Sequence, residues 1–152
     1  MEPAVPAEPP VFPVAPSRMG WVLVCDDTTS IRTLIRINLE LSGFGVVEAA
    51  DGQEALDVLV ARMDDPPRVV VIDAQMEPRD GWWAVRQIRS SRGLLHLPIV
   101  MATAAIQDHE RRRAEKTAVD AFVGKPFDPD HLVDIVEGFA REGRGYETAA
   151  RP

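Results

Sequence analysis

Five short apolar segments alternate along the chain with longer polar segments, and most of them end abruptly at a polar residue. They comprise residues 21–25, 44–48, 69–72, 97–102 and 119–123. The third segment consists entirely of β-branched residues and is followed at once by Asp73. Apolar runs that are too short for a helix are typical of strands buried on both faces of a sheet. The pattern therefore predicts five buried strands.

Apolar residues recur at helical spacing after four of these strands. The four sets are Ile31, Leu34, Ile35 and Leu39; Leu56, Leu59, Val60 and Met63; Trp82, Val85 and Ile88; and Leu132, Ile135, Val136 and Phe139. Residues 106–117 also favour a helix, although their apolar stripe is thin. Helix starts are marked by Asp51, with Glu54 three positions later, and by Asp128 before Pro129. Five strands alternating with five helices predict an α/β fold, with a parallel sheet, right-handed crossovers and helices on both faces.

The length and composition predict one globular domain with extended chain at both ends. The chain has 152 residues, of which 45% are hydrophobic and 27% charged, and this is ordinary for a soluble domain. Residues 1–18 hold six of the 13 prolines, which predicts a disordered Pro-rich tail. If this tail were instead a docking peptide, its anchors would be Val11, Phe12 and Val14. We expect the domain to span residues 19–141 and a flexible tail to span residues 142–152.

The net charge limits the kinds of partner that the protein can bind, and the cysteine content indicates the compartment in which it works. A net charge of −7 argues against a general nucleic-acid-binding protein, because no basic excess is available to neutralise phosphates. The single cysteine, Cys25, fits the reducing cytosol. No apolar run approaches the roughly 20 residues that a membrane-spanning helix needs. A cytoplasmic protein that binds neither nucleic acid nor membrane is therefore expected.

Polar residues follow four of the five predicted strands directly. They are Asp26 and Asp27, Asp73, Thr103, and Lys125. Because parallel strands end at the same edge of a sheet, we expect these side chains to lie close together. Three neighbouring carboxylates repel one another unless a cation is present, and oxygen-only ligands suit Mg²⁺ rather than zinc. A lysine, a hydroxyl and a metal ion around one aspartate predict a site for a phosphoryl group.

The order and spacing of these motifs resemble the receiver domain of two-component response regulators over about residues 20–141. The matching pieces are residues 24–27 with Ile31 and Arg32, residues 71–73 with Met76, Asp80 with Gly81, residues 101–104, and residues 122–127. The resemblance implies a flavodoxin-like, doubly wound, five-stranded sheet of order 2-1-3-4-5 with five helices. It also implies a stand-alone, single-domain response regulator.

The resemblance assigns a role to each matching residue. Asp73 would accept a phosphoryl group from a histidine kinase or a histidine phosphotransfer protein. Mg²⁺ would be bound by Asp27, Asp73 and the backbone carbonyl of Gln75, with Asp26 acting through water. Lys125 would pair with the phosphoryl oxygens. Thr103 and the Ala104 amide would donate hydrogen bonds to the phosphoryl group, and Thr103 and Phe122 would act as switch residues. Gln75 and Ala105 would tune the rate of autodephosphorylation.

Three positions depart from the pattern of this family. Glu77 stands where a proline is usual, four residues after the acceptor, and Pro78 follows it. We expect the loop to take a different path and the metal site to be weakened by the added negative charge. Phe122 lacks the hydroxyl of the tyrosine that is common at its position, so switching would depend on packing alone. Trp83 replaces a polar residue opposite the Val85 face and is a possible partner contact.

Signalling would proceed through a phosphorylation-dependent protein contact or through onward phosphotransfer to a histidine. Two alternatives remain open. A Mg²⁺-dependent phosphohydrolase with an aspartyl-phosphate intermediate would need a second carboxylate where Gln75 stands, which disfavours turnover of external phosphoesters. A pseudo-receiver that acts unphosphorylated as a binding module is supported only by the Glu77 departure.

Overall fold

The five apolar segments form one parallel sheet. In this computed structural model, which describes residues 12–14, 17–104 and 119–147, the strands are hydrogen-bonded in the order β2-β1-β3-β4-β5. Their bounds are β1 Trp21–Cys25, β2 Gly45–Ala49, β3 Val69–Asp73, β4 Ile99–Thr103 and β5 Ala121–Gly124. The predicted fold class and strand order are confirmed.

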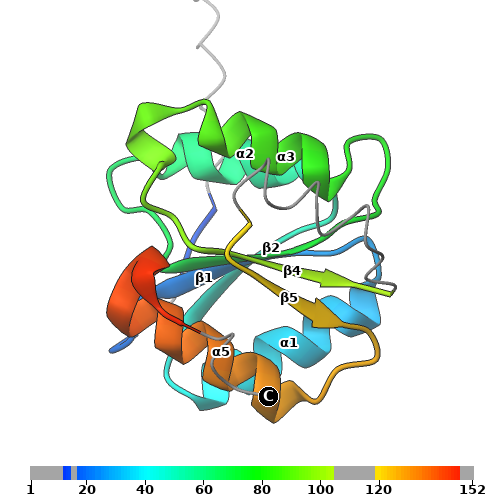
Figure 1. Cartoon of the computed structure of the whole chain (residues 1–152), viewed down its shortest axis with the longest axis vertical. Helices are drawn as coiled ribbons and strands as arrows, with labels where there is room; N and C mark the ends of the chain where they lie inside the picture. The colour runs from blue at the N-terminus through cyan, green and yellow to red at the C-terminus, as the bar shows by residue number, and fades with distance from the viewer. Residues whose placement is uncertain (1–11, 15–16, 105–118, 148–152) are drawn as a thin grey trace, which may run out of the picture.

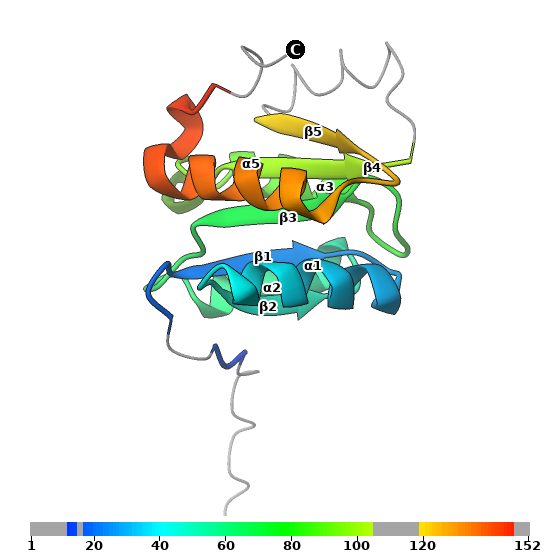
Figure 2. The same cartoon turned by 90° about the horizontal axis from the view of Figure 1, so that it is seen from below.

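Helices cover both faces of the sheet, as Figures 1 and 2 show. One face carries α1 and α5, and the opposite face carries α2 and α3. Their bounds are α1 Thr29–Leu41, α2 Gly52–Ala61, α3 Gly81–Arg89 and α5 Pro129–Glu142, with two short 3-10 segments, η1 Arg92–Leu94 and η2 Gly143–Gly145. The helix predicted over residues 106–117 lies outside the described residues. None of the helices in the described ranges has both the length and the apolar character needed to cross a bilayer.

Side-chain caps fix the starts of three helices, two of which, at Asp51 and Asp128, the sequence predicts. The Asp51 carboxylate accepts the Glu54 N–H at 2.9 Å, and the Asp128 carboxylate accepts the N–H of Asp130 at 3.0 Å. Asp80 caps α3 in the same way. Helix α1 differs, because the N–H of its N-cap residue Thr28 donates to the Asp26 carboxylate at 2.8 Å. The start of α1 is therefore attached to one of the candidate site residues.

The core consists of two apolar clusters, one between the sheet and the α2–α3 layer and the other between the sheet and the α1–α5 layer. The apolar face predicted for α2 is wrong in part. Val60 and Met63 are 63% and 44% exposed, whereas Ala55 and Val58 are fully buried. Both stripes have helical spacing, so periodicity alone could not distinguish them. The two helices pack closely, and the structure buries the stripe with the smaller side chains.

Both ends of the described chain make contacts where the sequence pattern predicts tails. Phe12 and Val14 pack against the first cluster, and the Arg62 guanidinium donates to the carbonyl of Phe12 at 2.9 Å. At the other end, the Tyr146 ring lies edge-on to Phe139 with 5.1 Å between centroids. The packed chain thus continues past residue 141. Val11 lies outside the described residues.

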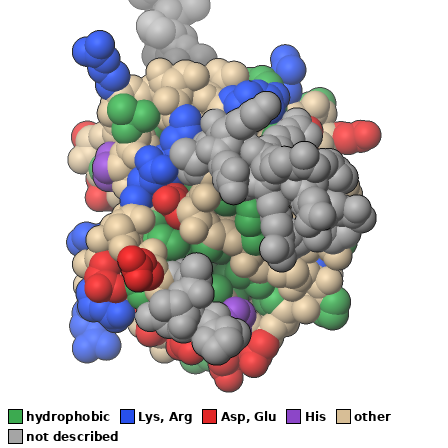
Figure 3. Space-filling model, viewed as in Figure 1, with side chains coloured by type: hydrophobic (Ala, Val, Ile, Leu, Met, Phe, Trp, Pro, Cys, Tyr) green, Lys and Arg blue, Asp and Glu red, His purple; other side chains and the backbone are tan. Residues whose placement is uncertain are grey.

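An ion cluster fixes the edge of the sheet at which the strands begin. The buried Asp120 carboxylate accepts from Arg89 and Arg144 at 2.9 Å each, and from the N–H of Ile99 at 2.8 Å. It therefore joins the end of α3, the start of β4 and the segment after α5. Elsewhere on the surface, the described acidic and basic side chains that face the viewer in Figure 3 are interspersed.

The corrected face of α2 predicts unequal effects for two neighbouring valines. Val58→Ala removes fully buried methyl groups and should lower the free energy of unfolding by about 1–3 kcal/mol. Val60→Ala removes mostly exposed groups and should change it by less than about 0.5 kcal/mol. Urea denaturation of both variants measures the difference. Equal losses would contradict the orientation of α2.

Candidate functional site at the carboxyl edge of the sheet

Three carboxylates meet where β1 and β3 end. Cys25 pairs with Ile72 in the register of these strands, which brings the residues that follow each of them to the same edge. Asp26 and Asp73 are 1% and 7% exposed, whereas Asp27 is exposed. Each of the three offers a carboxylate oxygen, and these oxygens lie within 4.8 Å of one another. The predicted convergence of the acids is present.

Lys125 supplies the opposite charge from the segment after β5. Its ammonium nitrogen lies 2.5 Å from Asp26 Oδ2 and 3.3 Å from Asp73 Oδ2. Burial alone would lower the pKa of Lys125, but its hydrogen bonds to the two acids and their negative charges outweigh burial and raise that pKa. The ammonium group therefore remains charged and bridges the two buried carboxylates.

The charge on Asp73 is only partly compensated. Burial is the largest effect and raises the pKa of Asp73, and the charge of Asp26 acts in the same direction. The N–H of Gln75, which donates to Asp73 Oδ1 at 3.2 Å, and the Lys125 ammonium both oppose this rise. The net increase means that the site still favours additional positive charge.

The donor set fits a hard divalent cation. Only oxygen ligands are present in the acid cluster, as Mg²⁺ prefers, and Asp27 has an exposed carboxylate directed to the shared site. Asp26, Asp27 and Asp73 could therefore hold such an ion. The contribution of the Gln75 carbonyl remains a prediction.

Thr103 and Ala104 lie beside the acid cluster at the end of β4. Asp73 pairs with Ala102 across the β3–β4 ladder, and the N–H of Lys125 donates to the Thr103 carbonyl at 2.8 Å. Thr103 is 2% exposed, whereas Ala104 is exposed. The sheet thus brings all five predicted strand-end residues to one edge. Ala105 lies outside the described residues.

The two aromatic positions singled out in the sequence differ in their surroundings. Phe122 on β5 is half-buried and contacts Trp82, with ring centroids 6.1 Å apart. Trp83 is half-buried rather than fully exposed, because it packs against the first core cluster and the Arg79 guanidinium lies over its ring at 4.9 Å. Much of its surface is therefore used within the fold.

The loop after Asp73 is held by backbone contacts. The Glu77-Pro78 peptide bond is cis, as is Lys125-Pro126, and the N–H of Gly52 at the start of α2 donates to the Arg79 carbonyl at 2.7 Å. Exposed Glu77 lines a cavity of about 470 Å³ together with Asp27, Gln75, Met76 and Asp80. The loop therefore opens a polar cavity beside the acid cluster.

Comparisons with known proteins agree with this geometry. Residues 22–137 match the family described as the response regulator receiver domain. The chain belongs to this family. The receiver domain is 35% identical over 120 residues to the alkaline phosphatase synthesis transcriptional regulatory protein PhoP of Bacillus subtilis, with 79% of this chain and 48% of that protein covered. It is 36% identical over 116 residues to the response regulator Rre1 of Synechocystis, with 76% and 49% covered.

The chain spans about half the length of these curated relatives. Among solved structures, the chemotaxis protein CheY4 of Vibrio cholerae is similar, with a TM-score of 0.71 and 28% identity over 78% of this chain and 97% of that one. The receiver domain therefore has the fold of a CheY protein. Receiver domains are phosphorylation-accepting modules of two-component systems, and they are signalling domains rather than conventional enzymes.

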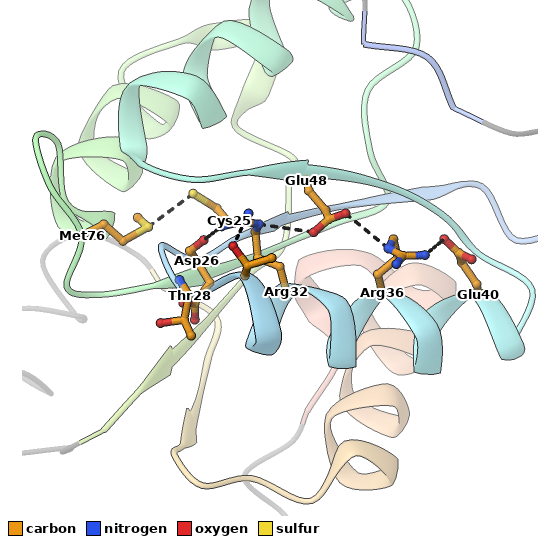
Figure 4. A network of polar contacts seen from close by, with 9 residues as sticks. Cys25, Asp26, Thr28, Arg32, Arg36, Glu40, Glu48 and Met76 are labelled. Carbon is orange, nitrogen blue, oxygen red and sulfur yellow. Dashed lines mark hydrogen bonds and ion pairs between the residues drawn. The ribbon is translucent and has the colours of Figure 1, made fainter.

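The receiver domain also contains polar contacts that sequence analysis did not assign. Arg32, quoted only as part of a motif, donates to the carbonyl of Asp26 at 2.6 Å, as Figure 4 shows. The only feature of the sequence that indicated this contact was the position of Arg32, five residues after Asp27. Cys25 lies inside the core, with its Sγ 3.5 Å from the Met76 sulfur, and burial raises its pKa far above the ordinary value. Cys25 is therefore a buried core residue.

Gly81 is the clearest steric requirement of the site. Its N–H donates to the carbonyl of Ala74 at 3.0 Å, and a Cβ on Gly81 would overlap the backbone carbonyl of Asp73. Neither of these groups can move without shifting the end of β3. Only glycine fits this position without displacing the backbone of the phosphoacceptor candidate.

Gly81→Ala should therefore destabilise the receiver domain by about 2–4 kcal/mol. Gly145→Ala is a matched control, because no atom lies within 4 Å of a Cβ at that position. Thermal and urea unfolding measure both variants. A loss at Gly81 no larger than the loss at Gly145 would contradict the close approach at Asp73.

Proposed function

We propose that this receiver domain accepts a phosphoryl group on Asp73 from a phosphohistidine of a histidine kinase or a histidine phosphotransfer protein. The observation that carries the proposal is the placement of Asp73. Its carboxylate lies at a strand end, 3.3 Å from Lys125 Nζ and close to two further carboxylates. A nucleophile, a cation for the phosphoryl oxygens and ligands for a metal ion are therefore within reach of one another.

The reaction is a phosphoryl transfer between two proteins. A carboxylate oxygen of Asp73 would form a bond to phosphorus while the phosphorus–nitrogen bond of the donor breaks, and the electron pair would return to the imidazole nitrogen. Bound Mg²⁺ would neutralise charge on the phosphoryl oxygens and on the acids that surround them. Lys125 would pair with a phosphoryl oxygen, and this new contact would replace its present contact with the Asp73 carboxylate.

Autodephosphorylation would reverse the modification. A water molecule would attack phosphorus, the bond to the Asp73 oxygen would break, and inorganic phosphate would leave. The side chain of Gln75 is exposed beside the acceptor, which suits the proposed role in tuning access of that water. Ala105 is assigned the same role by its place in the sequence.

Readout would start at the buried Thr103 hydroxyl. Movement of Thr103 toward the phosphoryl group, with help from the Ala104 amide, would empty space next to β5. Phe122 is half-buried there and contacts Trp82, so its rotation would alter packing on the β5 side of the sheet. The signal would pass to a protein that contacts this surface, or the phosphoryl group would pass onward to a histidine.

An apolar hollow beside the site suits the approach of the phosphodonor. A cavity of about 370 Å³ is lined by Ile31, Leu34, Lys125, Pro126 and Phe127. Leu34 is 43% exposed although it is apolar. Because a phosphohistidine must come within bonding distance of Asp73, its carrier protein must cover the surface around Lys125. We expect apolar side chains of that carrier to occupy the hollow.

Intact-mass measurement after incubation with acetyl phosphate and Mg²⁺ tests the proposal. The parent should gain the mass of one phosphoryl group, and Asp73→Asn should gain none. Asp134→Asn, which changes an exposed acid on α5, should behave like the parent. The absence of any gain in the parent would favour a pseudo-receiver, and an equal gain in Asp73→Asn would place the acceptor elsewhere.

A parallel assay addresses the phosphohydrolase alternative. Sustained release of phosphate from an aryl phosphate over many turnovers would support that enzyme class. We expect no such turnover, because Gln75 occupies the position at which that class needs a carboxylic acid.

A further inference from the structure

Arg32 lies on α1 beside Asp26 and Asp27, the acid pair at the end of β1, and outside the set of residues that would touch the phosphoryl group. Its guanidinium donates to the Asp26 carbonyl at 2.6 Å, to Glu48 Oε1 at 3.3 Å and to Thr29 Oγ1 at 3.3 Å. The side chain is only 15% exposed. Arg32 thus links the end of β1 to the neighbouring strand β2 and to the first turn of α1 (Figure 4).

Glu48 determines the direction of this guanidinium. It lies on β2 opposite Val24, and its two carboxylate oxygens bind different arginines of α1. Oε1 accepts from Arg32, and Oε2 lies 3.3 Å from Arg36 Nε. Arg36 also pairs with Glu40 at 3.3 Å. Side chains of α1 and β2 therefore form a chain of ion pairs of alternating sign, and within this chain only Arg32 reaches Asp26.

Every polar group of Asp26 is held by a different part of the fold. Its N–H donates to the Ala49 carbonyl at 3.1 Å, and its carboxylate accepts from the N–H of Thr28 and from Lys125. The carbonyl is held by Arg32. That carbonyl belongs to the peptide group joining Asp26 to Asp27, so the hydrogen bond from Arg32 fixes the plane of this peptide.

Asp27 depends on that peptide for its position. Its carboxylate is exposed, and its one hydrogen bond among the described contacts comes from the adjacent Thr28 hydroxyl at 3.3 Å. A surface carboxylate with so little support takes its direction mainly from the backbone. Fixing the peptide before Asp27 therefore directs this ligand toward the oxygens of Asp26 and Asp73.

We propose that Arg32, oriented by Glu48, is a positioning residue for the divalent-cation site: it fixes the Asp26–Asp27 peptide and thereby sets the metal affinity of the receiver domain. The inference rests on the proposed metal site. Groups that orient metal ligands without touching the metal typically contribute 10–100-fold to affinity. A purely structural role is the competing explanation, because the same ion pair attaches α1 to β2.

The chain offers a matched control for that competing explanation. Arg36 lies one turn further along α1, has the same chemistry and pairs with the same glutamate. In the described contacts it does not bond to Asp26. Loss of Arg36 should therefore weaken the attachment of α1 to β2 without disturbing the metal ligands.

The test is titration of the full chain with MgCl₂, followed by the amide NMR signals of Asp27 and Gln75. A dispersed spectrum shows that each variant is folded, and urea denaturation gives its stability. Arg32→Gln should raise the dissociation constant for Mg²⁺ by about 10-fold, and Arg32→Lys should have an intermediate effect, since one ammonium group cannot serve both partners. Arg36→Gln should leave the constant within about twofold of the parent value, well below the range typical of groups that orient metal ligands.

The outcomes separate the inference from the proposed function. Absence of saturable Mg²⁺ binding in the parent would overturn the proposed metal site itself. Binding by the parent with an unchanged constant in Arg32→Gln, or with equal losses in Arg32→Gln and Arg36→Gln, would overturn the role of Arg32. If Arg32→Gln does not fold, Glu48→Gln replaces it. Weakened binding in that variant supports the inference, and parent-like binding overturns it.

Discussion

The ammonium group of Lys125, 2.5 Å from Asp26 and 3.3 Å from Asp73, offsets a repulsion that the fold itself creates. A parallel sheet brings all its strand ends to one edge, and here two of those ends carry buried carboxylates. One lysine cannot compensate both of them together with Asp27. Burial of Asp73, which raises its pKa, adds to the cost of the charge that Lys125 leaves uncompensated, and a divalent cation at this site could offset it.

Backbone packing around Asp73 is as restrictive as its electrostatics. Gly81 allows the start of α3 to approach the Asp73 carbonyl, and Gly52 allows α2 to approach the Arg79 and Asp80 carbonyls, which would lie 2.7 and 2.6 Å from a Cβ at that position. The two glycines hold the loop after β3 between helices. Asp73 is thereby fixed through its backbone, while its carboxylate remains available at the edge of the sheet. Arg32 likewise fixes Asp26 through its backbone, because it donates a hydrogen bond to the Asp26 carbonyl.

Apolar runs that end in polar residues were sufficient to predict the strands and the meeting of Asp26, Asp73, Thr103 and Lys125 at one edge of the sheet. The strand order followed from the family resemblance rather than from this pattern. The pattern was insufficient where several side chains compete for one environment. Two stripes of α2 had the same spacing, and only packing against α3 determined that Ala55 and Val58 are buried and that Val60 is exposed. The clusters around Asp120 and Arg32 join residues far apart in the chain, and local patterns contain no information about such pairs. Trp83 was assigned to the surface from helical spacing, without the contact that Arg79 makes across its ring.

The melting temperature of Asp73→Asn, compared with that of the parent in EDTA and in Mg²⁺, tests most directly whether uncompensated negative charge organises this site. Burial raises the pKa of Asp73, so the charged form costs stability at neutral pH, while Lys125 keeps its partner Asp26 in the variant. We predict that Asp73→Asn melts at a higher temperature than the parent in EDTA. Addition of Mg²⁺ should raise the melting temperature of the parent and thereby reduce this difference. A variant that melts below the parent in EDTA, with no effect of Mg²⁺ on either protein, would contradict the account.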